Sequence, residues 1–243
     1  MPDPLPLTYA LLALAVLLSA WVQGFSGLGF SLIAAPVLTQ VIPGSSGIGL
    51  VNTLALAQNA WQVSREEGVI HWNVLKRMGP GLLGGVLLGV LALMLLPDRL
   101  RPLVVAMSSL LSMAVLIWWH PVSSARTATL SGAWGASVNT YAGVGGPPLA
   151  AYLVQQDWDP GSYIRTQQTV FALLNIMSIP LLGLPPLHLQ AFAGGIAIVV
   201  LGTSLGIAVR HRVPPERRKR ISQSMVLLVA GIALLRAVVQ LFG

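Results

Sequence analysis

The chain has 243 residues, of which 55% are hydrophobic and only 9% are charged. A soluble domain carries about 25% charged residues, so this composition excludes a water-soluble globular protein. Cysteine is absent, which excludes disulfides, thiol catalysis and cysteine-based metal sites. The composition predicts an all-α polytopic integral membrane protein that forms one domain over residues 1–243.

The net charge of +7 would suggest nucleic-acid binding in a soluble protein. Here, however, six basic residues lie together in the stretch 210–220, between two hydrophobic segments. Such a stretch is typical of a cytoplasmic loop under the positive-inside rule, and binding of anionic lipid headgroups is the alternative. We therefore expect the lipid bilayer as a partner and no nucleic acid. The four histidines fall at predicted helix ends or loops, so we predict no metal site and no cofactor.

A membrane-spanning helix needs about 20 mostly apolar residues. In chain order, the hydrophobic pattern predicts a broken segment, three spans, a second broken segment and three further spans, at 7–41, 47–63, 74–96, 103–119, 127–154, 166–182, 188–209 and 222–242. A cluster of glycines interrupts each broken segment.

The sequence divides into two homologous halves, 7–119 and 127–242. A shift of 116 positions superimposes glycine, alanine, threonine and asparagine residues, laying Gly27, Gly29, Ala34, Ala35, Thr53 and Asn59 on Gly143, Gly145, Ala150, Ala151, Thr169 and Asn175. One further residue of shift aligns Gly85, Leu88, Gly89 and Pro97 with Gly202, Leu205, Gly206 and Pro214. These matches indicate an internal duplication, in which each half holds a glycine-broken hairpin and about three spanning helices.

The positive charges of equivalent loops place these loops on opposite sides of the membrane. The loop at 64–77 carries arginine and lysine, whereas its counterpart at 181–192 has neither, and the basic 210–220 loop far exceeds its counterpart at 98–101. Both basic loops are cytoplasmic if each broken segment enters and leaves on one side, as a hairpin of two short helices. The halves are then inverted repeats, with the N-terminus outside. Eight single crossings with parallel repeats are the alternative.

The first break reads Gln23-Gly-Phe-Ser-Gly-Leu-Gly-Phe-Ser31, and the second reads Asn139-Thr-Tyr-Ala-Gly-Val-Gly-Gly-Pro-Pro148. Clustered glycines unwind a helix, and two prolines suit a helix restart. We expect a short helix after each cluster, whose free N–H groups and positive dipole end favour an anion. Irregular backbone at membrane depth must be buried or line a cavity, so two breaks predict a central site. The alternative is that the glycines only permit close helix packing.

Neutral polar residues gather at the breaks and on the helices that follow them. Asn59 and Asn175, matched by the repeat, lie inside predicted spans, where they must meet partners or a wet cavity. Helix–helix hydrogen bonding is their alternative role. Arg165, at the predicted cytoplasmic mouth, would attract an anion or act as an interfacial anchor. The predicted substrate-binding residues are Gln23, Ser26, Gly27, Gly29, Ser31, Asn52, Asn59, Asn139, Thr140, Tyr141, Gly143, Gly145, Gly146, Arg165, Gln168, Thr169 and Asn175.

No Asp, Glu or Lys lies deep in a predicted span, which disfavours a proton relay and favours an anion over a cation. An intramembrane serine protease is a second class of function, raised by the GxSG pattern at Gly24-Phe25-Ser26-Gly27. A serine nucleophile needs a general base within reach, and no histidine lies within a predicted span. The second half has Ala142 at the equivalent position. We therefore predict no enzyme and no catalytic residue.

The motifs Gly24-Phe-Ser-Gly-Leu-Gly-Phe-Ser31, Gly143-Val-Gly-Gly-Pro-Pro148 and Arg165-x-Thr, with their spacing, resemble the TauE/SafE sulfite exporter family over essentially the whole chain. The resemblance implies a prokaryotic plasma-membrane permease for sulfite, organosulfonates or related small organic acids, without an ATPase subunit. With the two breaks, we expect a secondary transporter whose inverted halves rock to expose one anion alternately. An anion channel, a permease for an unrelated solute and a scaffold subunit are the alternatives. The coupled ion, H⁺ or Na⁺, the transport direction and the oligomeric state stay open.

Overall fold

The computed structural model describes residues 6–42, 44–184 and 188–242, and in these ranges its regular structure is helical, with no strand. The elements in chain order are α1 (Pro6–Ser26), α2 (Phe30–Val41), α3 (Ser45–Arg65), α4 (Trp72–Leu95), the 3₁₀ turn η1 (Asp98–Leu100), α5 (Arg101–Trp118), α6 (Ala125–Ala142), α7 (Gly146–Leu153), α8 (Pro160–Leu182), α9 (Leu189–Arg210) and α10 (Pro215–Phe242). Every predicted span and both predicted breaks therefore coincide with helices and helix interruptions.

Five of the described helices are long and apolar enough, by length and composition, to cross a membrane: α1, α4, α5 together with η1, α9 and α10. Helices α3 and α8 were also predicted as spans, and they have the length but not the hydropathy. Both carry several buried amide side chains, which lower their hydropathy. A helix shielded from lipid can hold such groups because they face protein and not lipid tails. The fold is that of an all-α, multi-pass membrane protein.

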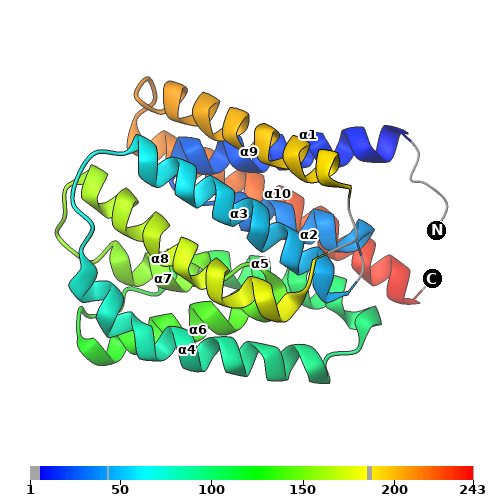
Figure 1. Cartoon of the computed structure of the whole chain (residues 1–243), viewed down its shortest axis with the longest axis horizontal. Helices are drawn as coiled ribbons and strands as arrows, with labels where there is room; N and C mark the ends of the chain where they lie inside the picture. Colours follow the sequence, from blue (N-terminus) through cyan, green and yellow to red (C-terminus); the bar gives the residue numbers. More distant parts are fainter. Residues whose placement is uncertain (1–5, 43, 185–187, 243) are drawn as a thin grey trace.

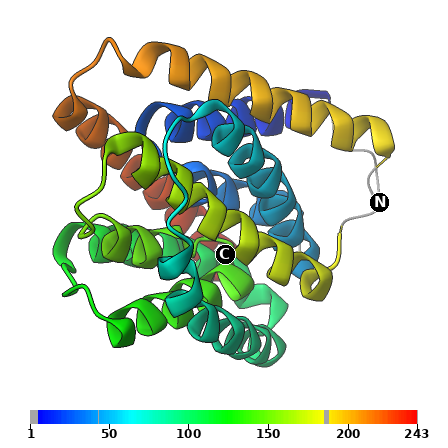
Figure 2. The same ribbon diagram turned by 60° about the vertical axis from the view of Figure 1, so that its left-hand side comes forward.

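The helices form a bundle with a pair of long helices at each of two opposite edges. Helix α9 packs along α1 at one edge and α4 packs along α6 at the other, while α3 and α8 pack against each other between these pairs (Figures 1 and 2). Helix α10 packs on α5 and α2. The two helices α3 and α8, which carry several buried amides, thus lie between the edge pairs.

The chain reverses at both glycine breaks. Gly27, Gly29 and Gly143 have φ angles of 84°, 140° and 75°, in the region that glycine adopts without a steric cost. In Figure 1, α1 begins and α2 ends at the end of the bundle where α3 begins, whereas α6 begins and α7 ends at the opposite end. The two broken segments therefore run as oppositely directed hairpins. Their first arms are longer than the short helices that we expected, because α1 has 21 residues and α6 has 18.

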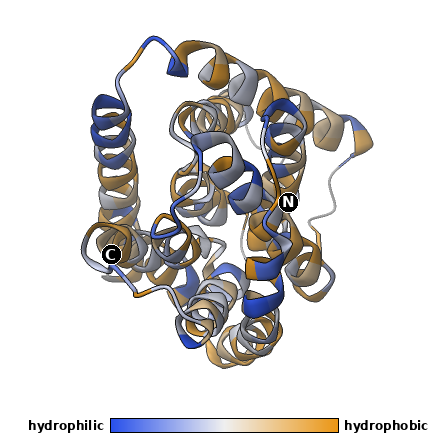
Figure 3. Cartoon of the chain, turned by 90° about the vertical axis from the view of Figure 1, so that its left-hand side faces the viewer, coloured by the Kyte–Doolittle hydropathy of each residue, from blue (hydrophilic) through white to orange (hydrophobic). Residues whose placement is uncertain are grey.

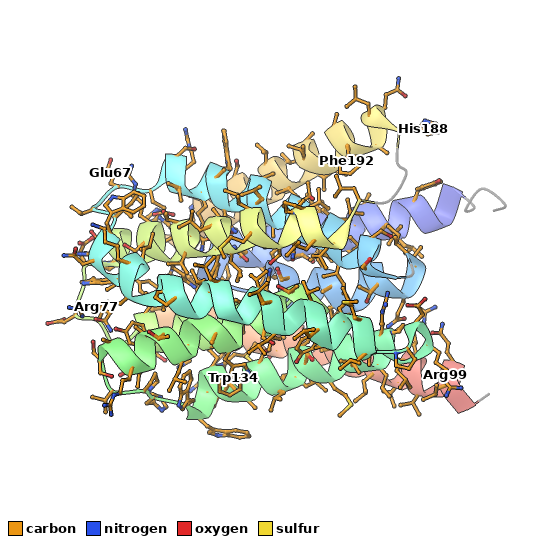
Figure 4. All side chains as sticks on the ribbon, turned by 60° about the horizontal axis from the view of Figure 1, so that its bottom comes forward. Glu67, Arg77, Arg99, Trp134, His188 and Phe192 are labelled. Atoms are coloured by element: carbon orange, nitrogen blue, oxygen red, sulfur yellow. The ribbon has the colours of Figure 1, made fainter. Side chains whose placement is uncertain are left out.

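The two ends of the bundle differ in charge. Figure 4 shows Glu67 and Arg77 at one end, which we call the Glu67 end, and Arg99 and His188 at the other, the Arg99 end. A buried ion pair between Arg210 and Glu66 places the start of the basic stretch 210–220 at the Glu67 end. Figure 3, which views the bundle from this end, shows hydrophilic residues at the near ends of several helices.

The outer face of α4 is apolar where a soluble protein would be polar. Leu83, Leu87, Leu91 and Leu95 follow one another at a spacing of one helical turn, and all are more than half exposed. Residues four apart lie on the same face of a helix, so they form a continuous apolar stripe. We infer that this stripe faces the lipid tails.

The helix pairs at the two edges pack backbone against backbone. A methyl group added at Gly85 of α4 would collide with the carbonyl oxygen of Ala133 in α6, and one at Gly202 of α9 would collide with that of Leu17 in α1. Gly85 and Gly202 are matched by the repeat at a shift of 117 positions, and Leu17 and Ala133 at the shift of 116. Each pair joins a helix of one half to a helix of the other through the same contact. This supports the proposed duplication.

Two neighbouring glycines of α4 provide a test of this packing. Gly85→Ala is expected to lower the stability by about 1–3 kcal/mol, because the added methyl group overpacks the contact with α6. Gly84→Ala, whose Cβ would meet nothing within 4 Å, is expected to be neutral or stabilising because alanine favours helix. Thermal unfolding of both variants in detergent measures the difference. Equal midpoints would contradict the packing described here.

The hairpin arrangement predicts the side of the membrane on which reporters appear. Helix α2 ends and α3 begins at the Arg99 end, so a reporter fused at residue 43 is expected outside, with the N-terminus. A reporter inserted at 211–214, at the Glu67 end, is expected in the cytoplasm because that loop is basic. Fused reporter enzymes that are active on only one side of the membrane measure the location of each position. The same location for both reporters would support eight single crossings.

Candidate functional site

The two breaks enclose a small cavity in the middle of the bundle. Its volume is about 20 Å³, enough for about one water molecule. Helices α1, α2, α3, α6, α7 and α8 contribute its walls, together with residues of the two breaks. The lining residues are Gln23, Leu28, Gly29, Ser31, Leu32, Ala55, Asn59, Asn139, Val144, Gly146, Pro147, Phe171, Leu174 and Asn175.

The breaks meet directly at this cavity. Gly29 from the first break and Gly146 from the second both line it. A Cβ atom added at Gly146 would lie 3.2 Å from Cδ1 of Leu28 and 3.3 Å from Cζ of Phe171. A larger residue at Gly146 would therefore press on the opposite break and on α8.

An amide pair of the same geometry occurs in each half. Nε2 of Gln23 donates to Oδ1 of Asn59 over 3.2 Å, and Nδ2 of Asn139 donates to Oδ1 of Asn175 over 3.2 Å. The 116-residue shift maps Gln23 onto Asn139 and Asn59 onto Asn175, so the two bonds are equivalent. All four side chains are at most 4% exposed. The sequence predicted these four residues for the site but not that they pair.

Gln23 has a second role, because it holds the first break in shape. Its Oε1 accepts a hydrogen bond from the backbone N–H of Phe30 over 3.0 Å, at the start of α2. Its Nε2 also donates to Oε1 of Gln168, and Nε2 of Gln168 donates to the carbonyl oxygen of Gly27, both over 3.0 Å. The hydrogen-bonding groups of Gln23 are thus used within the protein.

The asparagines on α3 and α8 keep unused donors. Asn59 and Asn175 accept through Oδ1, and among the described residues their Nδ2 groups have no hydrogen-bond acceptor. Neither Nδ2 is among the fully enclosed unpartnered atoms, unlike both side-chain atoms of Asn52. Since both asparagines line the cavity, each half presents one N–H₂ group to it.

The backbone amides at the two helix starts are not equivalent. At the start of α2, the N–H of Phe30 is taken by Gln23, while those of Ser31 and Leu32 have no hydrogen-bond partner among the described residues. At the start of α7, Pro147 and Pro148 have no N–H at all. Gly146, however, keeps its N–H, which has no hydrogen-bond partner among the described residues. Free amides therefore occur at both helix starts, but at different positions of the repeat.

No charged side chain of the described residues lines the cavity. None of its lining residues is Asp, Glu, Lys, Arg or His. Ser26, the serine of the GxSG pattern, lies outside the cavity, and its Oγ contacts the carbonyl oxygens of Val22 and Leu28 and Oγ of Ser222. None of these groups is a general base, so this part of the chain offers no arrangement for serine catalysis.

The structure brings some of the predicted site residues together and leaves others apart. Those that line the cavity are Gln23, Gly29, Ser31, Asn59, Asn139, Gly146 and Asn175. Gln168 lies next to it through its hydrogen bond with Gln23, and Gly27 through its hydrogen bond with Gln168. Ser26, Asn52, Thr140, Tyr141, Gly143, Gly145, Arg165 and Thr169 do not line it.

Several of the remaining residues have structural contacts instead. Arg165 donates through Nη1 to the carbonyl oxygen of Gly68 over 2.7 Å, which ties α8 to the α3–α4 loop. Thr140 lies 3.1 Å from Oγ of Ser178, between α6 and α8. Gly145 packs so closely on α6 that an added Cβ would collide with the carbonyl oxygen of Gly135.

The apolar half of the cavity wall was not predicted. Its members are Leu28, Leu32, Ala55, Val144, Pro147, Phe171 and Leu174. Ala55 and Phe171 lie one turn before Asn59 and Asn175, and helical spacing from these asparagines would have found them. Nothing in their side chains distinguishes them from lipid-facing residues in a chain that is mostly hydrophobic.

A comparison with protein families agrees with the fold. The family described as sulfite exporter TauE/SafE matches residues 12–234, nearly the whole chain. Searches of curated proteins and of solved structures found no match. The family comprises membrane transporters of the sulfite-exporter type, which agrees with a multi-pass bundle around a central polar cavity. The chain is therefore a member of the TauE/SafE sulfite exporter family.

Proposed function

We propose that the protein is a secondary transporter that carries a small anion, such as sulfite, an organosulfonate or an organic acid, across the plasma membrane of a prokaryotic cell. The observation that carries this proposal is the pair of unused N–H₂ donors that Asn59 and Asn175 present to one central cavity from opposite halves. Donors in a site of low dielectric stabilise negative charge without a buried ion pair.

The chemistry of the cavity fits an oxyanion. The Asn59 and Asn175 amides and the free backbone N–H groups at the start of α2 are all donors, and the positive end of the α2 dipole adds to them. Oδ1 of Asn139 is an acceptor without a partner among the described residues. It can accept a hydrogen bond from the O–H group of a hydrogensulfite ion, so the singly and doubly charged forms of the anion both find partners.

The size of the cavity supports a moving site. A sulfite ion has four heavy atoms, whereas the cavity holds about one water molecule. The walls must therefore separate when the ion enters, and the two breaks that form them belong to different halves. Opposite helix directions and equivalent contacts in the two halves support inverted repeats that rock around a central site, with the Glu67 end in the cytoplasm.

Replacing the donors is expected to impair transport. Asn59→Leu or Asn175→Leu removes one hydrogen bond to a charged ligand, about 1.5–3 kcal/mol, so sulfite flux into proteoliposomes falls at least about tenfold. The matched control is Ile176→Ala, because Ile176 is the neighbour of Asn175 on α8 and is 53% exposed. Flux that stays normal in both folded asparagine variants would disprove the assignment.

The sign of the transported charge is tested by Asn175→Asp. The two side chains have nearly the same shape, but the carboxylate repels an anion and attracts a cation. We expect Asn175→Asp to abolish sulfite flux and the thermal stabilisation that sulfite gives to the purified protein. Retained sulfite flux together with new stabilisation by Na⁺ would indicate a cation permease instead.

A further inference from the structure

A second, larger cavity lies beside the first break at the Glu67 end. Its volume is about 470 Å³, and residues such as Trp119, His120 and Gln155, from the loops at this end, form part of its wall. Leu28 and Leu32 line this cavity and the central one alike. Among the described residues, only these two leucines are common to both walls, so they separate a large outer space from the central site.

The charged residues that line this cavity are all basic. Arg218 and Lys219 line it, and none of its lining residues is Asp or Glu. Within the described ranges, Arg210 pairs with Glu66 and Arg101 with Asp98, but Arg218 is in no ion pair. Its Nε is enclosed without a partner, and Nη1 makes one long contact of 3.5 Å to the carbonyl oxygen of Phe25. A half-buried guanidinium without a carboxylate is costly unless an anion reaches it.

The start of α10 is fixed over the break. Ser222, one turn after Arg218, lies 3.0 Å from Oγ of Ser26 and donates to the carbonyl oxygen of Leu28 over 3.2 Å. Ser26 also donates to that carbonyl over 2.7 Å. The Arg218 side chain is therefore held beside the segment that separates the two cavities.

We propose that this cavity is the entrance vestibule for the anion at the Glu67 end, and that Arg218, with Lys219, binds the anion before it passes Leu28 to the central site. The proposal rests on the proposed function and adds a recognition site outside the central cavity. The shared chemistry is that of anionic oxygens on sulfur or phosphorus. We assign the site to the free anion and not to a lipid headgroup.

A cysteine reporter measures the potential in the vestibule without relying on transport. The chain has no cysteine, so Gln223→Cys, on the vestibule wall, introduces a single thiol. The readout is the ratio of its reaction rates with an anionic sulfonate methanethiosulfonate and with a cationic trimethylammonium methanethiosulfonate. In the Q223C background, Arg218→Gln is expected to lower this ratio on the order of tenfold, because it removes a nearby positive charge.

The matched control is Arg217→Gln, which removes the same charge from the adjacent, exposed residue outside the vestibule wall. It is expected to change the ratio less than about twofold because exposed charges are screened. Arg218→Lys keeps the charge and is expected to keep the ratio, which separates loss of charge from misfolding. Equal effects of R217Q and R218Q, or no effect of R218Q, would overturn the proposal.

The lipid composition separates the two sources of anionic oxygens. In vesicles of phosphatidylcholine alone, R218Q is expected to lower the ratio, and this effect is expected to persist when phosphatidylglycerol is added. An effect that phosphatidylglycerol abolishes would show that a lipid headgroup neutralises Arg218 and would overturn the proposal. The reporter also separates this proposal from the proposed function. A ratio that depends on Arg218 without any sulfite flux would support the vestibule and contradict sulfite transport. Normal sulfite flux with a ratio that does not depend on Arg218 would support sulfite transport and contradict the vestibule.

Discussion

Backbone that leaves the helical conformation inside a membrane must find its hydrogen bonds within the protein, because lipid offers none. In this structure the first break meets that requirement through one side chain. Gln23 binds the first N–H of α2, and it also binds the amides of Asn59 and Gln168 on the two central helices. The position of α2 is thereby tied to α3 and α8. The shape of the central cavity depends on this set of bonds.

The same requirement explains how polarity is distributed over the bundle. Outer helices such as α4 and α9 carry apolar residues toward lipid, and their pairing relies on glycines that let backbones approach, as in other membrane helices. The inner helices α3 and α8 carry amides that would be costly in lipid. Asn52, Gln62 and Gln167 are buried there, and their side-chain nitrogen and oxygen atoms have no partner among the described residues. Such unpartnered groups on the central helices suit the rearrangement that the proposed transport cycle requires.

Much of the fold could be predicted from the sequence because its signals are strong and local. Runs of about 20 apolar residues mark spans, and clusters such as Gly27 to Gly29 mark interruptions, so both breaks were placed within a few residues.

The site was only partly predictable. The repeat singled out Asn59 and Asn175, but which amide each one meets depends on how α1 and α3 approach each other, and no local pattern contains this. Arg165 stood out as a charge near a predicted span, yet it binds the carbonyl of a loop that is distant in sequence. The basic stretch 210–220 gave a topology signal, and only the packing of α10 beside the first break distinguishes Arg218 from its neighbours.

The prolines at the start of α7 have a consequence for energetics. In a carrier made of two chemically identical inverted halves, a symmetry axis would interchange the inward-open and outward-open conformations, and their free energies would be equal. Pro147 and Pro148 remove from the second half the amides that Ser31 and Leu32 keep in the first. Under the proposed mechanism the two conformations are then unequal, so one of them predominates at rest. The anion accordingly meets sites of different affinity from the two faces of the membrane, whatever gradient drives it.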